Sequence, residues 1–423
     1  MKENCIDALN AVISRFTPED TRLVATMMAK QIRHGRFAPL QRADLVLTEC
    51  CNCRCSYCFE GDRPRASMTV DILERAIDFV FREAGDSRVV VFVLFGGEPL
   101  TRCDLVRHAV KYANRVAIGL GKRVGYEMTT NGTLLSEEII DFGAANGLSY
   151  LLSLDGDRET HDRHRRRAEG SGTYDRIVRW IPYLKRRQRW LGARVTPMPD
   201  TVGRLAANIR HLRSLGLNQF LIGMAAGQKW QRAAIEVYRE QWEEIADFYL
   251  SERRQGKPMR IKEFESSWDS LAHDRRNVWG CSGGRSQVTI APDGGIYPCA
   301  RFMSLTDPFT GGRGAYKLGT LGEGMCNLGC REELTNACGA CRVGCLRCEF
   351  REACLGSCPA VNYEENDSIF RCSPYLCEEQ KILLGLIRRR SELCTAGDDR
   401  CCAAGARLDC PALQVIGAPI ATC

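Results

Sequence analysis

Three cysteines on one short loop are the first residues whose spacing indicates chemistry. Cys51, Cys55 and Cys58 follow the apolar run 43–48 and form the pattern C-x3-C-x2-C. An iron–sulfur cube held entirely by protein takes four thiolates. Three thiolates would leave one iron open to a small molecule, as the open position does in catalytic zinc sites. Zinc is the alternative metal, although its usual C-x2-C pair is matched by a distant second pair.

Two neighbouring cysteines, Cys50 and Cys53, are alternative ligands in the same loop. The x3-x2 spacing, with the aromatic Tyr57 directly before the last cysteine, favours the trio at 51, 55 and 58. We therefore take the trio as the predicted ligand set.

The chain holds 24 cysteines among its 423 residues, and they gather in clusters. None occurs from residue 104 to 280, twelve fall between Cys281 and Cys377, and five follow from Cys394 to the end. Reduced thiolates are ligands for soft metals, so such clusters predict metal binding. Disulfides are the alternative, chiefly for the last thirty residues.

Strand and helix patterns alternate through the middle of the chain. Residues 70–83 place Leu73, Ile77 and Val80 on one helical face, and the apolar run 88–95 is typical of a strand covered on both faces. Six such strand–helix units predict an α/β fold with a partial (β/α)6 barrel, because a closed barrel needs eight. We expect strands near 43–48, 88–95, 122–129, 148–154, 193–197 and 217–224, and helices near 70–83, 104–118, 136–146, 173–189, 203–214 and 231–254.

Polar or glycine-rich segments follow four of the predicted strands. The cysteine loop follows the first, GGEP (96–99) the second, TNGT (130–133) the third, and residues 153–155 end the fourth. The carboxyl ends of parallel strands meet at one edge, where such folds carry their working residues. The sequence therefore predicts a site at this rim.

At these positions the sequence resembles the radical S-adenosylmethionine (radical SAM) superfamily, over about residues 41–380. In that family the open iron binds SAM, and one electron splits SAM to a 5′-deoxyadenosyl radical that takes a hydrogen atom from an unactivated carbon. The resemblance implies a [4Fe–4S] cluster on Cys51, Cys55 and Cys58. It also implies SAM contacts from the residues that match the family's segments, which are Tyr57, Gly96, Gly97, Glu98, Pro99, Asn131, Ser153, Asp155 and Arg165.

The roles that the resemblance implies agree with simple chemistry. Glycines let the backbone approach a ligand closely. The carboxylate of Glu98 would pair with the SAM ammonium, and the guanidinium of Arg165 would pair with the SAM carboxylate. Taken singly, GGEP is also compatible with a turn, and Arg165 with one charge of the solvated run 161–167.

A second cysteine framework resembles a SPASM domain, the extension that holds two auxiliary [4Fe–4S] clusters in some radical SAM enzymes. In that family Cys281, Cys299 and Cys358 would serve the first auxiliary cluster. Its fourth ligand is open, because residues 282–298 contain no cysteine. Either that iron meets substrate or one of four spare cysteines completes the set. The second auxiliary cluster would take Cys345, Cys348, Cys354 and Cys372, and the spare cysteines are Cys326, Cys330, Cys338 and Cys341.

Composition shifts divide the chain into four expected parts. They are an N-terminal helical extension (1–40), the radical SAM barrel (41–264), the SPASM unit (265–380), and a C-terminal helix with a cysteine-rich tail (381–423). The hydrophobic share of 44% and the net charge of +7 are ordinary for a globular protein. With no signal-peptide layout and no apolar run of about 20 residues, we expect a cytoplasmic protein.

The resemblance implies an oxidoreductase that acts on a peptide. Sulfatase (formylglycine) maturases of the family carry an aspartate base directly after the second SPASM cysteine, but this sequence has Ala300 there. An alanine cannot accept a proton, so we favour a maturase of ribosomally made peptides that forms a thioether or carbon–carbon link. Asp293 and Asp307 are the nearby carboxylates. An electron carrier that kept the fold is a further alternative, against which the intact SAM segments count.

The expected partners follow from this reading. They are a ribosomally made precursor peptide, a reductant such as flavodoxin or ferredoxin, and a separate leader-binding protein, since too few residues precede the first strand for a leader-binding module. Basic stretches at 163–167, 185–189 and 388–390 would steer an acidic leader. We expect neither nucleic acid nor a membrane as a partner.

Overall fold

The computed structural model describes residues 37–60, 65–272, 280–307, 310–336, 342–390 and 393. Most of the expected N-terminal extension and the cysteine-rich tail lie outside these residues. So do two of the spare cysteines, Cys338 and Cys341.

One ten-stranded sheet organises the described residues, in the order β10-β9-β8-β1-β2-β3-β4-β5-β6-β7. The neighbouring pairs from β8 through β1 to β7 are parallel, and β9 pairs antiparallel with both β8 and β10. The strands are β1 Arg42–Thr48, β2 Val89–Gly96, β3 Arg123–Thr130, β4 Leu148–Ser153, β5 Gly192–Val195, β6 Gln219–Ile222, β7 Arg260–Ile261, β8 Gln287–Ile290, β9 Gly295–Tyr297 and β10 Gly319–Thr320.

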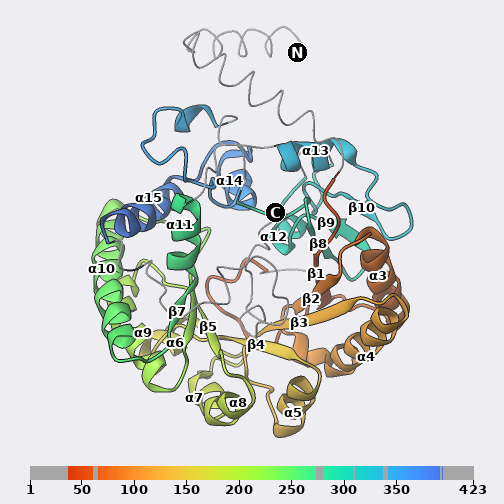
Figure 1. The fold of residues 1–423 in the computed structure, drawn as a ribbon, viewed down its shortest axis with the longest axis horizontal. Helices are drawn as coiled ribbons and strands as arrows, with labels where there is room; N and C mark the ends of the chain where they lie inside the picture. Colours follow the sequence, from red (N-terminus) through yellow and green to blue (C-terminus); the bar gives the residue numbers. More distant parts are fainter. Residues whose placement is uncertain are drawn as a thin grey trace, which may run out of the picture.

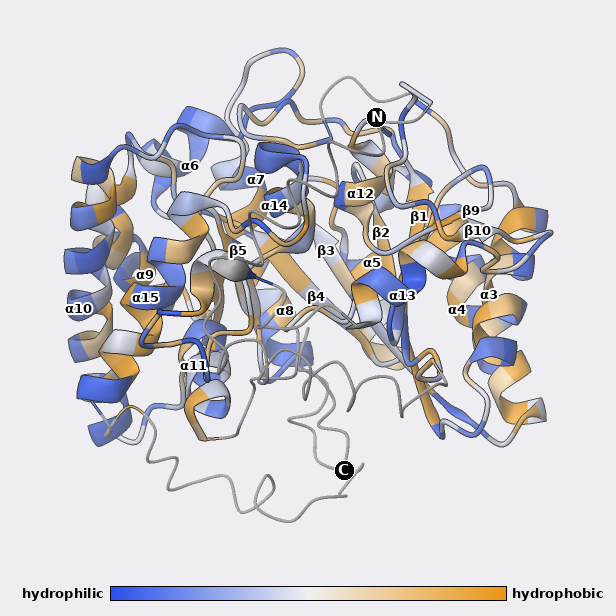
Figure 2. Ribbon diagram, turned by 90° about the horizontal axis from the view of Figure 1, so that it is seen from above, coloured by the Kyte–Doolittle hydropathy of each residue, from blue (hydrophilic) through white to orange (hydrophobic). Residues whose placement is uncertain are grey.

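Helices form an outer ring around the strands (Figure 1), as expected for an α/β barrel that is left open. Those that cover the barrel show hydrophobic bands toward the sheet and hydrophilic bands outward (Figure 2). They are α3 Val70–Glu83, α4 Cys103–Gly119, α5 Glu137–Ala145, α6 Arg158–His164, α7 Tyr174–Val178, α8 Ile181–Arg187, α9 Leu205–Ser214, α10 Arg232–Arg254, α11 Lys262–Ala272 and α15 Pro374–Arg389. Shorter helices follow in the C-terminal part, α12 Ala300–Ser304, α13 Leu328–Asn336 and α14 Pro359–Asn366.

Local sequence explains why the first helix begins where it does. The Thr69 side chain accepts a hydrogen bond from the Ile72 N–H over 3.2 Å and so caps α3. The predicted apolar face, including Leu73, Ile77 and Val80, is fully buried. The predicted bounds of this helix are confirmed.

The barrel lining carries charge at its amino-terminal end. Ala43 and Leu45 of β1 are buried in the main core, so the pleat turns Arg42 and Asp44 to the opposite face. There Arg42 donates to Glu127 of β3 over 2.6 Å. Asp44 accepts from Thr289 of β8 over 3.2 Å. These bonds link strands on both sides of β1.

The structure differs from the expected elements in three places. The predicted helix at 173–189 is two helices, α7 and α8, and Pro182 lies in the first turn of α8 because proline fits a helix start. The sequence pattern did not predict α6, which has no apolar residue, the two-residue strand β7, or α11, which crosses the expected boundary at residue 264. The sheet also runs past the expected boundary at residue 264, because β8 pairs in parallel with β1. The division into domains stays a prediction.

A hairpin turn at Asp293–Gly294 joins β8 to β9, which pair antiparallel. Gly294 has a φ of 82° and its N–H donates to the Ala291 carbonyl over 2.9 Å. The Asp293 carboxylate accepts from the Gly295 N–H over 2.9 Å. In the described part of the chain, no helix is long and apolar enough to cross a membrane.

The outer packing gives a stability prediction. Trp242 of α10 is fully buried, edge-on to Tyr238 and 5.3 Å from the Phe264 ring centroid. Trp242→Ala should lower the free energy of unfolding by about 3–5 kcal/mol, because it leaves a cavity. Urea denaturation followed by circular dichroism measures this. Trp268→Ala, at a 46% exposed tryptophan of α11, is the matched control, and equal losses in both variants would contradict the packing.

Candidate active site

The cysteine loop, residues 49–60, leaves β1 and lies against the segment after α6. The Arg54 N–H donates to the Arg166 carbonyl over 2.7 Å, and the Ser56 N–H donates to the His164 carbonyl over 3.0 Å. The loop is therefore held by backbone hydrogen bonds, which leave its side chains available for ligation.

The five cysteines of this loop differ in exposure. Cys51 and Cys58 are exposed, Cys50 and Cys55 are half-buried, and Cys53 is buried. Exposure sets Cys53 apart from the predicted trio, because a ligand must reach the metal. The trio's assignment stays a prediction.

Two thiols of the trio differ in acidity. A hydrogen bond from Cys53 lowers the pKa of Cys51 against the effect of burial, and the Cys53 N–H lies 3.3 Å from the Cys51 sulfur. Burial raises the pKa of Cys55 to about 11. Only thiolates bind metal, so ligation would have to release the proton of Cys55.

Glycines let the GGEP segment lie directly against the start of the cysteine loop. A Cβ on Gly96 would stand 2.1 Å from the Thr48 carbonyl oxygen, and one on Gly97 would stand 2.6 Å from that of Cys50. The Gly97 N–H donates to the Thr48 carbonyl over 2.9 Å. The close approach fixes β2 to the loop, and any side chain at either position would break it.

Glu98 is buried beneath the rim and holds the TNGT loop. Its carboxylate accepts from the Thr130 hydroxyl and the Asn131 N–H, each over 2.7 Å, and from the Leu100 N–H over 3.1 Å. Burial raises the pKa of Glu98 to about 7 despite these donors. Pro99 follows at the start of a short 3-10 helix, Pro99–Arg102.

Asn131 joins the TNGT loop to the cysteine loop. Its amide nitrogen donates to Asn52 over 2.8 Å and lies 3.8 Å from the Cys51 sulfur. Asn52 in turn donates to Thr133 over 2.8 Å. Asn52 and Thr133 were not among the predicted site residues, because their contacts form only in the folded rim.

Asp155, Arg165 and Tyr57 form a buried cluster beside the loop. Arg165 donates to the Asp155 carboxylate from Nε over 2.8 Å and from Nη2 over 3.3 Å. The Tyr57 hydroxyl also donates to this carboxylate, and the guanidinium carbon lies 5.2 Å from the Tyr57 ring centroid. Burial raises the pKa of Asp155, but Arg165 outweighs it and the net shift is downward. The pair is therefore ionised and fixed.

His161 orients this cluster and was missed as a functional residue. It is fully buried; its Nδ1 accepts from the Asp155 N–H over 3.3 Å, and its Nε2 lies 2.8 Å from the Thr173 hydroxyl. Burial lowers the pKa of His161 to about 4, so it is neutral. Ser153, at the end of β4, is 8% exposed and pairs in register with Arg194. A pocket borders the cluster, lined by Asp155, Thr160, His164, Thr196, Pro197, Thr201, Leu205 and Asn208.

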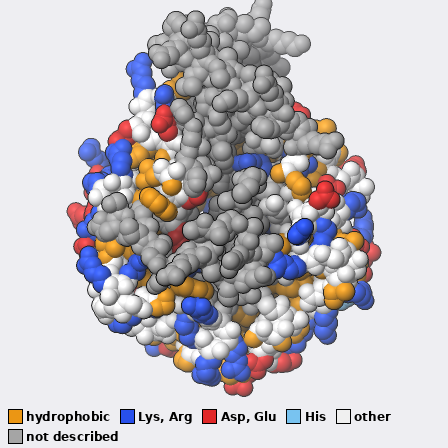
Figure 3. Space-filling view, viewed as in Figure 1, with side chains coloured by type: hydrophobic (Ala, Val, Ile, Leu, Met, Phe, Trp, Pro, Cys, Tyr) orange, Lys and Arg blue, Asp and Glu red, His pale blue; other side chains and the backbone are white. Residues whose placement is uncertain are grey.

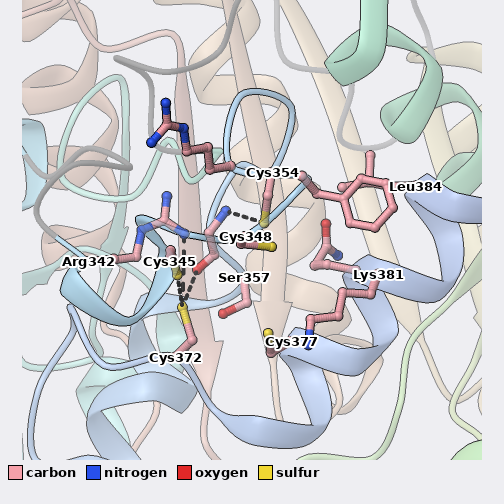
Figure 4. A pocket seen from close by; sticks show the side chains of 13 residues that line it. Arg342, Cys345, Cys348, Cys354, Ser357, Cys372, Cys377, Lys381 and Leu384 are labelled. Atoms are coloured by element: carbon pink, nitrogen blue, oxygen red, sulfur yellow. Dashed lines mark hydrogen bonds between the residues drawn. The ribbon is translucent and has the colours of Figure 1, made fainter. Parts of the chain in front are cut away.

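All four cysteines predicted for the second auxiliary cluster line one pocket (Figure 4). The sulfurs of Cys345 and Cys372 are 3.9 Å apart. Cys377 of α15 lies in the same pocket as a fifth thiol. Cys348 and Cys354 also line this pocket. The structure thus brings together side chains that span residues 345–377.

The three cysteines predicted for the first auxiliary cluster also meet. The charges of Cys281 and Cys358 act on the Cys299 thiol, and burial with these charges raises its pKa. The Gly283 N–H donates to the Cys281 sulfur over 3.4 Å. Burial and the charge of Glu333 raise the pKa of the spare Cys330. The fourth ligand stays undetermined.

Among the described residues, no three His, Cys, Asp or Glu side chains could hold a single metal ion together. The thiolates of an iron–sulfur cluster bind different iron atoms. A donor set of three or four thiols is suited to such a cluster.

The family comparison identifies the part of the chain that carries the rim. The sequence model of the Radical SAM superfamily matches residues 45–201, which include the cysteine loop, GGEP, TNGT and the Asp155–Arg165 pair. The chain carries a radical SAM domain. Domains of this family use a [4Fe–4S] cluster and SAM.

Relatives and solved structures extend the likeness beyond the radical SAM domain. An uncharacterized protein of Archaeoglobus fulgidus is 28% identical over 84% of this chain and 83% of its own length. The serine-type anaerobic sulfatase-maturating enzyme of Klebsiella aerogenes is 25% identical over 73% of this chain and 77% of its own. Native anSMEcpe with bound AdoMet has a TM-score of 0.69 at 17% identity, covering 84% of this chain and all 100% of that one. Streptococcus suis SuiB bound to the precursor peptide SuiA has a TM-score of 0.59 at 16% identity, covering 86% and 82%. These structures confirm the predicted fold class.

The basic stretches of the radical SAM domain and of α15 are largely paired with acids. Arg163 pairs with Asp200, and Arg187 with Asp141. Arg388, Arg389 and Arg390 likewise have acidic partners. On the face shown in Figure 3, basic side chains lie scattered among acidic ones. Steering of an acidic leader by these stretches stays a prediction.

The buried ion pair of the radical SAM domain gives a second prediction. Asp155→Asn should lower the free energy of unfolding by about 3–5 kcal/mol, because Arg165 is left buried without its partner. The pKa of Asp155 is depressed, so the wild-type advantage is full above the ordinary carboxyl pKa of about 3.9 and is lost as pH falls through the depressed value.

Urea denaturation at several pH values tests this. Asp175→Asn is the control, because that carboxylate and its partner Arg158 are each 61% exposed, and its unfolding midpoint should match wild type. A difference between Asp155→Asn and wild type that does not shrink in acid would argue against the ion pair.

Proposed function

We propose that this protein is a radical SAM maturase of a ribosomally made peptide, in which Cys51, Cys55 and Cys58 hold the SAM-binding [4Fe–4S] cluster. The observation that carries the proposal is the rim itself. The three thiols of the loop, of which Cys51 and Cys58 are exposed, lie in the radical SAM domain with the GGEP segment packed against the loop and with the fixed Asp155–Arg165 pair. With its cofactors bound, such a site supplies a 5′-deoxyadenosyl radical that takes a hydrogen atom from the substrate.

The chain's own residues would position SAM. The Asp155 carboxylate accepts hydrogen bonds from Nε and Nη2 of Arg165. The third nitrogen, Nη1, would donate to the SAM carboxylate. The GGEP backbone, which Gly96 and Gly97 hold against the cysteine loop, would meet the methionine end of SAM. Glu98 accepts three hydrogen bonds within the rim, so its main effect is to hold Asn131 and the GGEP backbone in place for SAM.

Two auxiliary clusters would occupy the C-terminal cysteine sets of a SPASM unit. Cys345, Cys348, Cys354 and Cys372 share one pocket. Cys281, Cys299 and Cys358 lie within electrostatic reach of one another. The set of four thiols would ligate all four irons of one cluster, and the set of three would leave one iron of the other cluster open. A reductant such as flavodoxin or ferredoxin would supply the electron that starts the reaction.

A peptide substrate is supported by the structural neighbours. AnSMEcpe has been solved with AdoMet and the Cp18Cys peptide, at a TM-score of 0.69. SuiB has been solved with its precursor peptide SuiA. Both share this fold, so we extend the substrate class, a peptide, to this chain.

Ala300 favours a cross-linking reaction over formylglycine formation. It follows Cys299 at the start of α12 and is 6% exposed, and its methyl group accepts no proton. The nearby carboxylates serve turns: Asp293 accepts from the Gly295 N–H, and Asp307 from the Thr310 N–H over 2.8 Å. We therefore propose that hydrogen abstraction leads to a thioether or carbon–carbon link.

Formylglycine formation is the second candidate, because a curated sulfatase-maturating relative covers 73% of this chain. It would require a base other than the residue at position 300. The two candidates share hydrogen abstraction from a peptide and differ in what happens to the substrate radical.

The ligand assignment predicts the outcome of a triple substitution. Cys51→Ala, Cys55→Ala and Cys58→Ala together should remove the iron of one cluster, keep the auxiliary iron, and abolish 5′-deoxyadenosine formation with dithionite and SAM. Iron analysis and chromatography measure both. Cys103→Ala, at a half-buried cysteine that starts α4, is the control. Unchanged iron in the triple variant would refute the assignment.

Co-expression with a short peptide encoded beside the gene tests the reaction. The proposal predicts that the peptide loses two hydrogen atoms and that fragment ions between the two joined residues are missing. A hydrazide probe, which reacts with aldehydes, tests for formylglycine formation. A peptide that reacts with the probe carries an aldehyde and indicates a formylglycine maturase.

A further inference from the structure

A buried arginine faces the thiols of the second auxiliary set. Arg342 precedes the short 3-10 helix Val343–Cys345 and is 2% exposed. It lines the same pocket as Cys345, Cys348, Cys354 and Cys372. Figure 4 shows its guanidinium pointing toward Cys372. Burying a cation is costly unless negative charge lies beside it.

Arg342 contacts a cysteine sulfur and occupies space that a glycine leaves. Its Nη1 donates to the Cys372 sulfur over 3.9 Å. A Cβ on Gly356 would stand 2.1 Å from Nη1, so the glycine makes room for the guanidinium. The geometry is that of a cation built to face thiolates.

The two other cationic side chains that line the pocket, Arg351 and Lys381, bind other groups. Arg351 donates from Nη1 to the Leu346 carbonyl over 2.8 Å. Lys381 pairs with Glu378 over 2.7 Å and is 42% exposed. Arg342 is therefore the pocket cation whose charge is directed at the sulfurs.

Resting on the function proposed above, we infer that Arg342 is a positioning residue that raises the reduction potential of the cluster held by Cys345, Cys348, Cys354 and Cys372. Reduction adds one negative charge to a cluster. A buried cation beside its thiolates stabilises the reduced form more than the oxidised form, because the low dielectric strengthens their attraction.

A raised potential suits the cross-linking step. After the 5′-deoxyadenosyl radical has taken a hydrogen atom, closing the new bond requires the substrate to lose one more electron and one proton. The electron would pass to the oxidised auxiliary cluster and the proton to solvent. A one-electron carrier of the ferredoxin or flavodoxin class would then take the electron away.

Potentiometric titration followed by electron paramagnetic resonance tests the inference on the full-length holoenzyme. Arg342→Gln and Arg342→Met should each move one auxiliary signal to lower potential and leave the other signals in place. Arg342→Lys should bring the potential of that signal back most of the way to the wild-type value, because it keeps the positive charge. Arg351→Gln should leave every potential unchanged.

The outcomes separate this inference from the proposed function. Full iron content with an unshifted potential in both Arg342 variants would overturn the role of Arg342 alone. Loss of the cluster's iron in both would also overturn it, because Arg342 would then be needed for assembly. If Cys345→Ala and Cys372→Ala both left the iron content and all signals unchanged, the proposed ligand set itself would fail.

Discussion

The rim depends on backbone hydrogen bonds that hold a loop rich in cysteine but poor in apolar side chains. Such a loop cannot be fixed by a core of its own, because its thiols must stay accessible. Arg54 and Ser56 instead pair with the segment after α6, and Gly97 brings the end of β2 against Cys50. Parallel strands supply the common edge at which these separate segments can meet.

Buried charge is the second constraint on this protein, and at the rim and in the pocket of the second auxiliary set it lies beside a fixed partner. Asp155 and Arg165 neutralise each other beneath the rim, and His161 stays neutral between them and Thr173. Arg342 faces sulfur instead of carboxylate. Each of these groups is oriented by the fold before any ligand arrives, which lowers the reorganisation that binding requires.

Periodicity and motif order predicted the part of the fold that has clear signals. The bounds of α3 follow from the apolar positions Leu73, Ile77 and Val80, and six strand–helix units follow from the alternation of patterns. The strand β7 has only two residues and the helix α6 has no apolar residue, so neither shows a periodic pattern. The role of His161 and the network through Asn52 depend on side chains meeting across loops far apart in sequence. A sequence carries no local signal for such contacts.

The parallel pairing of β8 with β1 makes the cysteine-rich half a structural part of the barrel. Without residues 287–290, one side of β1 would present unpaired amides and carbonyls directly beneath the cysteine loop, and exposed strand edges invite association with other chains. The catalytic half is therefore not a module that can be cut free at residue 264. A chimera that exchanges the C-terminal clusters would have to keep the native hairpin through Tyr297 and place its junction beyond it.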